Sequence, residues 1–199
     1  MRADAIVFGI AGSLFGLIIG WVLGTQQAGR SVPVAAPVAQ AAPAQQAAAS
    51  PQPAPIDPAK VKELEDAAAK NPKDTESRVL LGNIFFDAEQ YPQSITWYEQ
   101  ALAIKPGDPN VSTDLGVAYY YTNQPDRALK QFDHSLSIDP KHVKTLLNVG
   151  IVRAFGKQDL AGASQAWQQV VDLAPTTPEG MAAKKGLEGI KGAHGDGAK

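Results

Sequence analysis

A pattern of apolar and small residues occurs three times between residues 75 and 176. A large aliphatic residue precedes glycine at Leu81-Gly82, Leu115-Gly116 and Val149-Gly150, and the glycines lie 34 residues apart. This period is typical of a solenoid of helix-turn-helix units, in which each unit buries its apolar face against the next. After each glycine come a small residue, an aromatic residue, another small residue and a proline. These residues are Ser94, Tyr98, Ala101 and Pro106, then Ala128, Phe132, Ser135 and Pro140, and finally Ala163, Trp167, Val170 and Pro175. The second small residue is the least exact position of the pattern, because the third unit has Val170 there.

Capping residues and prolines divide each unit into two helices. We expect first helices near 75–88, 109–122 and 143–156, and second helices near 91–104, 125–137 and 160–173. Asp57, Asp74, Asp108 and Thr177 stand where side chains cap helix starts. The glycine and the small residue allow two helix axes to approach closely, while the aromatic side chain fills the remaining space.

The ends of the array need capping, since terminal units otherwise expose the face that neighbours bury. A half-repeat helix is predicted within residues 57–73 and a closing helix within 177–190. The glycine-rich residues 191–199 are predicted to form a disordered tail.

The order of residues resembles the tetratricopeptide repeat family over residues 74–176, with units at 75–108, 109–142 and 143–176. The resemblance implies an all-α, right-handed superhelical solenoid of three repeats with half-repeat caps. Arg78 and Ser112 stand where the family prefers Trp, and Arg153 replaces an aromatic residue. The third unit carries one extra residue near its turn, which should be looser. Because such repeats bind many unrelated partners, the resemblance alone names no function.

The amino-terminal part contains an apolar stretch over residues 5–24, after a short tip over residues 1–4. The stretch has no charged residue and is long enough to cross a membrane as a helix. No small-x-small site follows it, so a retained single-pass anchor is favoured over a cleaved signal peptide. Glycines spaced four residues apart would allow packing against a second transmembrane helix, in a homodimer or a partner, and equally they could reflect only that glycine is common in membrane helices. These glycines are Gly12, Gly16, Gly20 and Gly24.

Residues 25–56 are rich in alanine, proline and glutamine, with Arg30 as the only charge. Too few large apolar residues are present for folding, so a disordered tether is predicted. The charges that flank the apolar stretch weakly favour a cytoplasmic amino terminus. By analogy with the Ala/Pro/Gln-rich linkers of bacterial envelope proteins, the anchor is predicted to lie in a bacterial inner membrane with the repeats in the periplasm.

Composition restricts the chemistry. The 199 residues carry 18 basic and 20 acidic side chains, so no basic face for nucleic acid is implied, and there is no cysteine for a disulfide or a thiolate metal site. The spacing of His134, His142 and His194 does not match that of metal ligands. His194 and Asp196 are expected to be solvent-exposed rather than to bind a metal ion. No catalytic grouping or phosphate-binding loop is found, so neither an enzyme nor a bound cofactor or metal is expected.

The resemblance implies that a partner binds to the inner surface, which is lined by the first helix of each unit. Aromatic residues there would bury an apolar segment, and Asn83 and Asn148 would hydrogen-bond its backbone. Tyr120 is assigned to the groove, whereas Tyr121 could equally pack between units. The clamp that some members use for a carboxy-terminal acid is not expected, since Val79 and Asp114 replace its Lys and Asn, although Asn83 and Lys144 fit. The predicted groove residues are Asn83, Phe86, Asp87, Thr113, Val117, Tyr120, Tyr121, Lys144, Asn148 and Ile151.

These features predict a non-catalytic, membrane-anchored adaptor or scaffold that binds a client protein or peptide beside an envelope membrane complex. Two alternatives remain open. The chain could be a structural accessory subunit that packs into a membrane enzyme through its glycine-striped helix. It could also be an assembly chaperone of the cytochrome c maturation or translocon-associated type.

Overall fold

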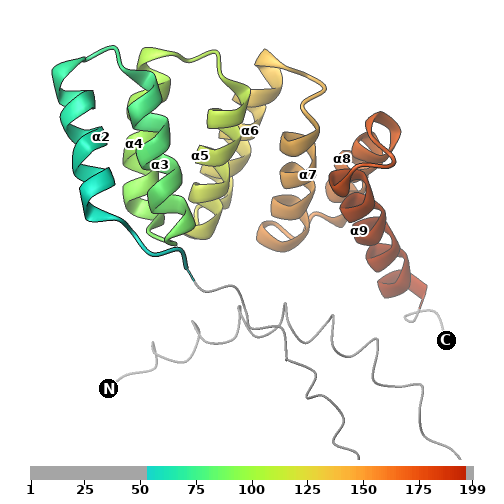
Figure 1. Cartoon of the computed structure of the whole chain (residues 1–199). Helices are drawn as coiled ribbons and strands as arrows, with labels where there is room; N and C mark the ends of the chain where they lie inside the picture. The colour runs from blue at the N-terminus through green and yellow to red at the C-terminus, as the bar shows by residue number, and fades with distance from the viewer. Residues whose placement is uncertain (1–52, 196–199) are drawn as a thin grey trace, which may run out of the picture. The chain divides into compact units, whose positions relative to one another are not determined.

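The protein is described by a computed structural model over residues 53–195, with only the backbone from residue 193 onwards (Figure 1). Helices follow one another in pairs, and the part of the chain that is described contains no strand. The helices are α2 (Pro58–Lys70), α3 (Thr75–Asp87), α4 (Tyr91–Ile104), α5 (Pro109–Tyr121), α6 (Pro125–Ile138), α7 (Val143–Ile151), the π-helical η1 (Val152–Gly156), α8 (Leu160–Leu173) and α9 (Pro178–Gly195).

The prediction of an all-helical repeat solenoid is confirmed for these residues. Within the repeats, each helix begins at the predicted residue, and the four predicted side-chain caps form. Backbone N–H groups donate to Asp57, Asp74, Asp108 and Thr177 over distances of 2.9 to 3.2 Å. The predicted anchor and most of the tether lie outside the described residues, and no helix within 53–195 is long and apolar enough to cross a membrane.

Two stretches differ from the prediction. The first helix of unit three ends in the π-helical turn η1, where Lys157 N donates to Val152 O at 3.0 Å. This hydrogen bond joins residues that are five apart in sequence, as in a π-helix. The extra residue of the unit is therefore accommodated within the helix. The closing helix was predicted to end near Ile190, but α9 continues to Gly195. Glycine costs a helix only about 1 kcal/mol relative to alanine, so Gly192 weakens the helix without ending it.

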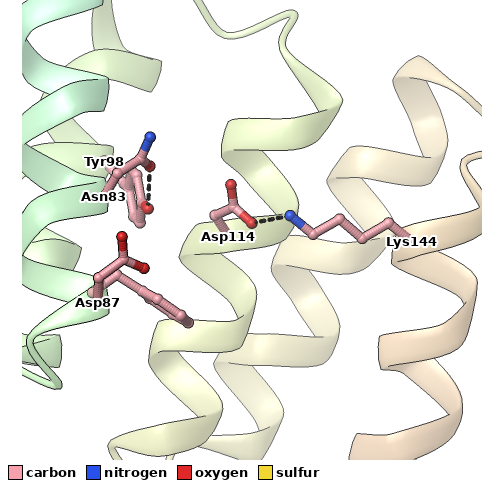
Figure 2. A pocket seen from close by; sticks show the side chains of 6 residues that line it. Asn83, Asp87, Tyr98, Asp114 and Lys144 are labelled. Carbon is pink, nitrogen blue, oxygen red and sulfur yellow. Dashed lines mark hydrogen bonds and ion pairs between the residues drawn. The ribbon is translucent and has the colours of Figure 1, made fainter. Parts of the chain in front are cut away.

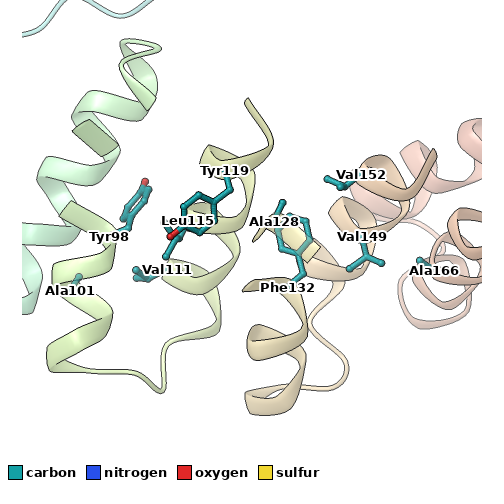
Figure 3. Close-up of a cluster of buried hydrophobic side chains, with 10 residues drawn as sticks. All are labelled: Tyr98, Ala101, Val111, Leu115, Tyr119, Ala128, Phe132, Val149, Val152 and Ala166. Carbon is teal, nitrogen blue, oxygen red and sulfur yellow. The ribbon is translucent and has the colours of Figure 1, made fainter. Parts of the chain in front are cut away.

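The glycines of the first helices lie directly against aromatic rings of the second helices. A Cβ atom added to Gly82, Gly116 or Gly150 would come closer than 3.0 Å to ring atoms of Tyr98, Phe132 and Trp167, respectively. All three rings are buried. Figure 3 shows how Tyr98, Phe132 and smaller residues of α4 to α8 form one of the two apolar clusters of the solenoid. In each unit, an aromatic ring of the second helix therefore packs directly against the backbone of the first helix at its glycine.

A buried group of hydroxyls joins units two and three. Thr113 Oγ1 on α5 lies 2.6 Å from Thr145 Oγ1 on α7 and 3.1 Å from Ser135 Oγ on α6, and all three side chains are fully buried. Thr113 also donates to Pro109 O at 2.7 Å. His142 Nδ1 lies 2.6 Å from Thr145 Oγ1. This group fixes the angle between the two units through directional bonds rather than apolar contact alone.

Arg78, at a position where Trp was expected, joins the capping helix α2 to α3. Its guanidinium donates to Ala68 O at 3.1 Å and to Asp74 O at 2.5 Å. The first of these carbonyls belongs to the last turn of α2, where the helix has no partners of its own for its C=O groups. Arg78 therefore replaces an apolar contact with a hydrogen-bonded cap.

Candidate peptide-binding groove

The first helices of the three units, α3, α5 and α7, form one face, which we call the groove face. A hollow of about 290 Å³ opens on it. Its lining comes from all three of these helices and from α4, which lies behind them (Figures 1 and 2). The lining residues are Asn83, Phe86, Asp87, Tyr98, Asp114 and Lys144.

The charges of the hollow are unequal. Lys144 Nζ on α7 donates to Asp114 Oδ1 on α5 at 2.6 Å, so this carboxylate has a counter-ion (Figure 2). Asp87, at the end of α3, is exposed, and no cation among the described residues pairs with it. Two carboxylates and one ammonium leave the hollow with a negative balance.

Tyr98 reaches the hollow from the second helix of its unit. Its ring is only 2% exposed, yet its hydroxyl donates to Asn83 Oδ1 at 2.7 Å. Burial, and then the charges of Asp114 and Asp87, hold the pKa of Tyr98 well above its ordinary value, so the hydroxyl remains a neutral donor. Because the oxygen of Asn83 is occupied, the amide nitrogen is the group that this side chain offers to a ligand.

The predicted groove residues do not all reach the groove surface. Thr113 is fully buried in the hydroxyl group, so its assignment to the groove was wrong. Asn148 donates to Lys144 O at 2.8 Å within its own helix. Val117 and Ile151 are half-buried, and each packs against one of the two apolar clusters. Both therefore contribute to packing between helices.

Tyr120 is also half-buried and packs against the core. A Cβ added to Gly156 of η1 would lie 3.1 Å from Tyr120 Cε2. The ring therefore sits between units two and three, a packing role for a residue that the sequence analysis assigned to the groove.

Three aromatic residues form what we call the aromatic rim, next to the hollow at the ends of α3 and α5. Tyr91 and Tyr121 stack with ring centres 4.6 Å apart, and Phe86 meets both edge-on at 5.4 and 6.0 Å. Tyr121 is 56% exposed. Sequence reasoning missed Tyr91, because it precedes the proline that opens α4 and lies outside the repeated pattern. The rim supplies an apolar surface beside the polar hollow.

A second hollow, of about 430 Å³, lies between α4, α5 and α6. Beside it, Tyr119 donates to Glu99, and Arg127 Nη2 donates to Glu99 Oε1 at 3.1 Å. The guanidinium of Arg127 also lies 4.0 Å from the centre of the Tyr119 ring. Tyr119, Glu99 and Arg127 thus satisfy one another's hydrogen-bonding groups. Residues 53–195 contain no group of three or more His, Asp or Glu side chains that could hold a metal ion.

Family models identify the repeats. A model described as TPR repeat matches residues 82–123, and one described as tetratricopeptide repeat matches residues 110–142. These residues therefore contain tetratricopeptide repeats, and no curated protein matches the chain.

Solved structures of similar fold include several peptide complexes. The first TPR of Spaghetti (RPAP3) bound to the HSP90 peptide SRMEEVD is 21% identical, with a TM-score of 0.53 over 70% of this chain and 97% of that one. The second TPR domain of human RPAP3 in complex with the HSP70 peptide SGPTIEEVD is 21% identical, with a TM-score of 0.52 over 59% and 98%. The Yersinia enterocolitica type III secretion chaperone SycD in complex with a YopD peptide is 18% identical, with a TM-score of 0.55 over 58% and 91%. At these identities the likeness shows the fold, and these neighbours are peptide-binding domains.

Proposed function

We propose that the chain is a non-catalytic, membrane-anchored adaptor whose groove face binds an extended peptide of a client protein. The observation that carries this proposal is the hollow beside the aromatic rim. Side chains from three successive units converge there, and the combination of an apolar wall with a few polar groups is typical of peptide-binding surfaces.

The similar structures support the same role. Three of them hold a peptide, and tetratricopeptide folds of this kind are usually adaptors or scaffolds without catalysis. The mode of recognition would be one in which side-chain pockets select the sequence and amide groups hold the peptide backbone. Phe86 and the amide nitrogen of Asn83 are suited to these two tasks.

The tether reaches the solenoid beside the groove. Ala54 N donates to Asp87 O at 2.9 Å, and Asp87 also lines the hollow. In the proposed arrangement residues 5–24 span a bacterial inner membrane and residues 25–56 connect that anchor to repeats in the periplasm. A client held in the groove is then kept near the anchor, which raises its effective concentration at a membrane complex.

A pull-down of the full-length protein in mild detergent tests the proposal. It is compared with Phe86→Ala on the groove face and with Leu173→Ala, which removes a 41% exposed side chain from α8. Partners identified by mass spectrometry should be lost with Phe86→Ala and kept with Leu173→Ala, while circular dichroism shows that both variants fold. Equal recovery by all three proteins would contradict recognition on the groove face.

The structural-subunit alternative rests on the glycine stripe of the apolar stretch, because four glycines in one register permit close helix packing. A chain without residues 1–24 separates the two functions. An adaptor still recovers its client without the anchor, whereas an accessory subunit loses its partners. Gly16→Leu with Gly20→Leu in the full chain should abolish partner recovery only for the accessory subunit.

A further inference from the structure

The hollow of the groove face carries a carboxylate that nothing in the described part of the chain neutralises. Lys144 is engaged with Asp114 at 2.6 Å, and the other cations that form ion pairs lie elsewhere. Asp87 is therefore left as an exposed anion at the wall of a concave site.

Its position strengthens the negative potential. Asp87 is the last residue of α3, and the carboxyl end of a helix carries partial negative charge, which favours a cation. Asp114 lines the opposite side of the same hollow on α5 (Figure 2). After burial, which is the larger cause, both carboxylates raise the pKa of the Tyr98 phenol, so both lie close enough to act on the same group.

The peptides bound in two similar structures are acidic, whereas the negative balance of this hollow favours a basic ligand. Their sequences, SRMEEVD and SGPTIEEVD, both end in EEVD. A segment of three acids that entered this hollow would place like charges beside Asp87 and Asp114, and such contacts exclude a partner. The charge of this hollow is therefore not complementary to these acidic peptides.

We infer that the hollow is a subsite for a lysine or arginine side chain of the client peptide, with the Asp87 carboxylate as its counter-ion. The inference rests on the proposed peptide binding by the groove face and specifies its ligand. The apolar stem of the basic side chain lies along Phe86, as such stems do on aromatic surfaces, while the charged head reaches Asp87. The amide nitrogen of Asn83 has no partner among the described residues and donates to a carbonyl of the peptide backbone.

The test uses full-length protein in detergent micelles to select from a library of displayed random peptides. Wild type is compared with Asp87→Asn and with the matched control Asp133→Asn, an exposed carboxylate on α6 with no ion pair among the described residues. Wild type and Asp133→Asn should enrich peptides with lysine or arginine, and Asp87→Asn should lose that preference.

A selected peptide then gives a quantitative check. Replacing its basic residue with glutamine should weaken binding to wild type by about tenfold, the effect of one charge-assisted hydrogen bond. The same replacement should change binding to Asp87→Asn by less than about twofold, because the partner is already absent.

The outcomes distinguish the two proposals. Enrichment of neutral or acidic peptides by wild type overturns the basic subsite while leaving peptide binding intact. Equal loss of affinity in wild type and Asp87→Asn overturns the pairing with Asp87. If wild type enriches no peptide over empty micelles, both the basic subsite and peptide binding by the groove face are refuted.

Discussion

The contact between Gly116 and Phe132 gives the sharpest test of how a unit is held together. A Cβ at residue 116 would approach two ring atoms of Phe132 to less than 3.0 Å. Phe132 is fully buried, so its ring cannot move into solvent to relieve the clash. Gly116→Ala must therefore separate α5 from α6 or force the ring out of its preferred rotamer.

The magnitude follows from two opposing effects. Overpacking of a buried site costs about 1–3 kcal/mol, and a contact this short with a fixed ring belongs at the upper end. Alanine regains about 1 kcal/mol of helix propensity relative to glycine. The free energy of unfolding should therefore fall by about 2 kcal/mol, which lowers the melting temperature of a domain of this size by roughly 6–8 °C.

A matched control separates the two effects. Gly189 lies within α9, and a Cβ added there meets no atom within 4 Å. Gly189→Ala should therefore gain the helix propensity alone, about 1 kcal/mol, and melt a few degrees higher than wild type. Both variants are compared with wild type by thermal unfolding in the same detergent, followed by circular dichroism. A Gly116→Ala protein as stable as Gly189→Ala would refute the close approach of ring and backbone.

Three further predictions concern polar contacts. Thr113→Val removes the hydroxyl that joins units two and three, and the partners left buried should cost about 1–3 kcal/mol in chemical denaturation; unchanged stability would show that the group is not bonded as described. Burial first, and then Glu99, raise the pKa of Tyr119 to about 12, and the pKa of Tyr98 is raised as well. Because the folded state holds these protons more tightly, stability should be constant below pH 10 and fall as the pH rises toward 12, with tyrosinate absorbance appearing together with loss of helix; full ionisation near pH 10 in a folded protein would contradict this. Arg78→Met keeps the apolar stem but removes the bonds to α2, so amide exchange should accelerate in α2 and not in α5; equal exchange in α2 of both proteins would contradict the cap.

The fold could be predicted because every unit repeats the same local rules. The spacing of glycines sets the period, and residues such as Asp74 and Asp108 fix where helices begin. The π-turn η1 could not be predicted, because the extra residue of unit three could equally have lengthened the loop. The extension of α9 was missed because glycine weakens a helix by an amount that local context can offset.

The candidate site was predicted in part. The resemblance to the tetratricopeptide repeat family placed Asn83, Phe86, Asp87 and Lys144 on the groove face, and all four line the hollow. Thr113 precedes Asp114 by one residue, and that step of about 100° turns its side chain from the groove into the interface with α6 and α7.

The hydroxyl of Tyr98 was not anticipated in the hollow. Its ring crosses Gly82, which has no side chain to block it, so a core aromatic of the second helix reaches the surface lined by the first. A pattern of residue types along one helix does not show such a crossing, because it depends on how two helices pack.

The central claim is that a peptide with a basic residue binds to the groove face. Hydrogen exchange of the full-length protein, measured by mass spectrometry with and without a selected lysine- or arginine-containing peptide, tests it most directly. The account predicts slower exchange in α3, α5 and α7, with α6 and α8 unchanged, and weaker protection in Asp87→Asn at the same peptide concentration, near the Kd of wild type. Protection confined to α4 and α6, around the second hollow, or equal protection in Asp87→Asn, would contradict it.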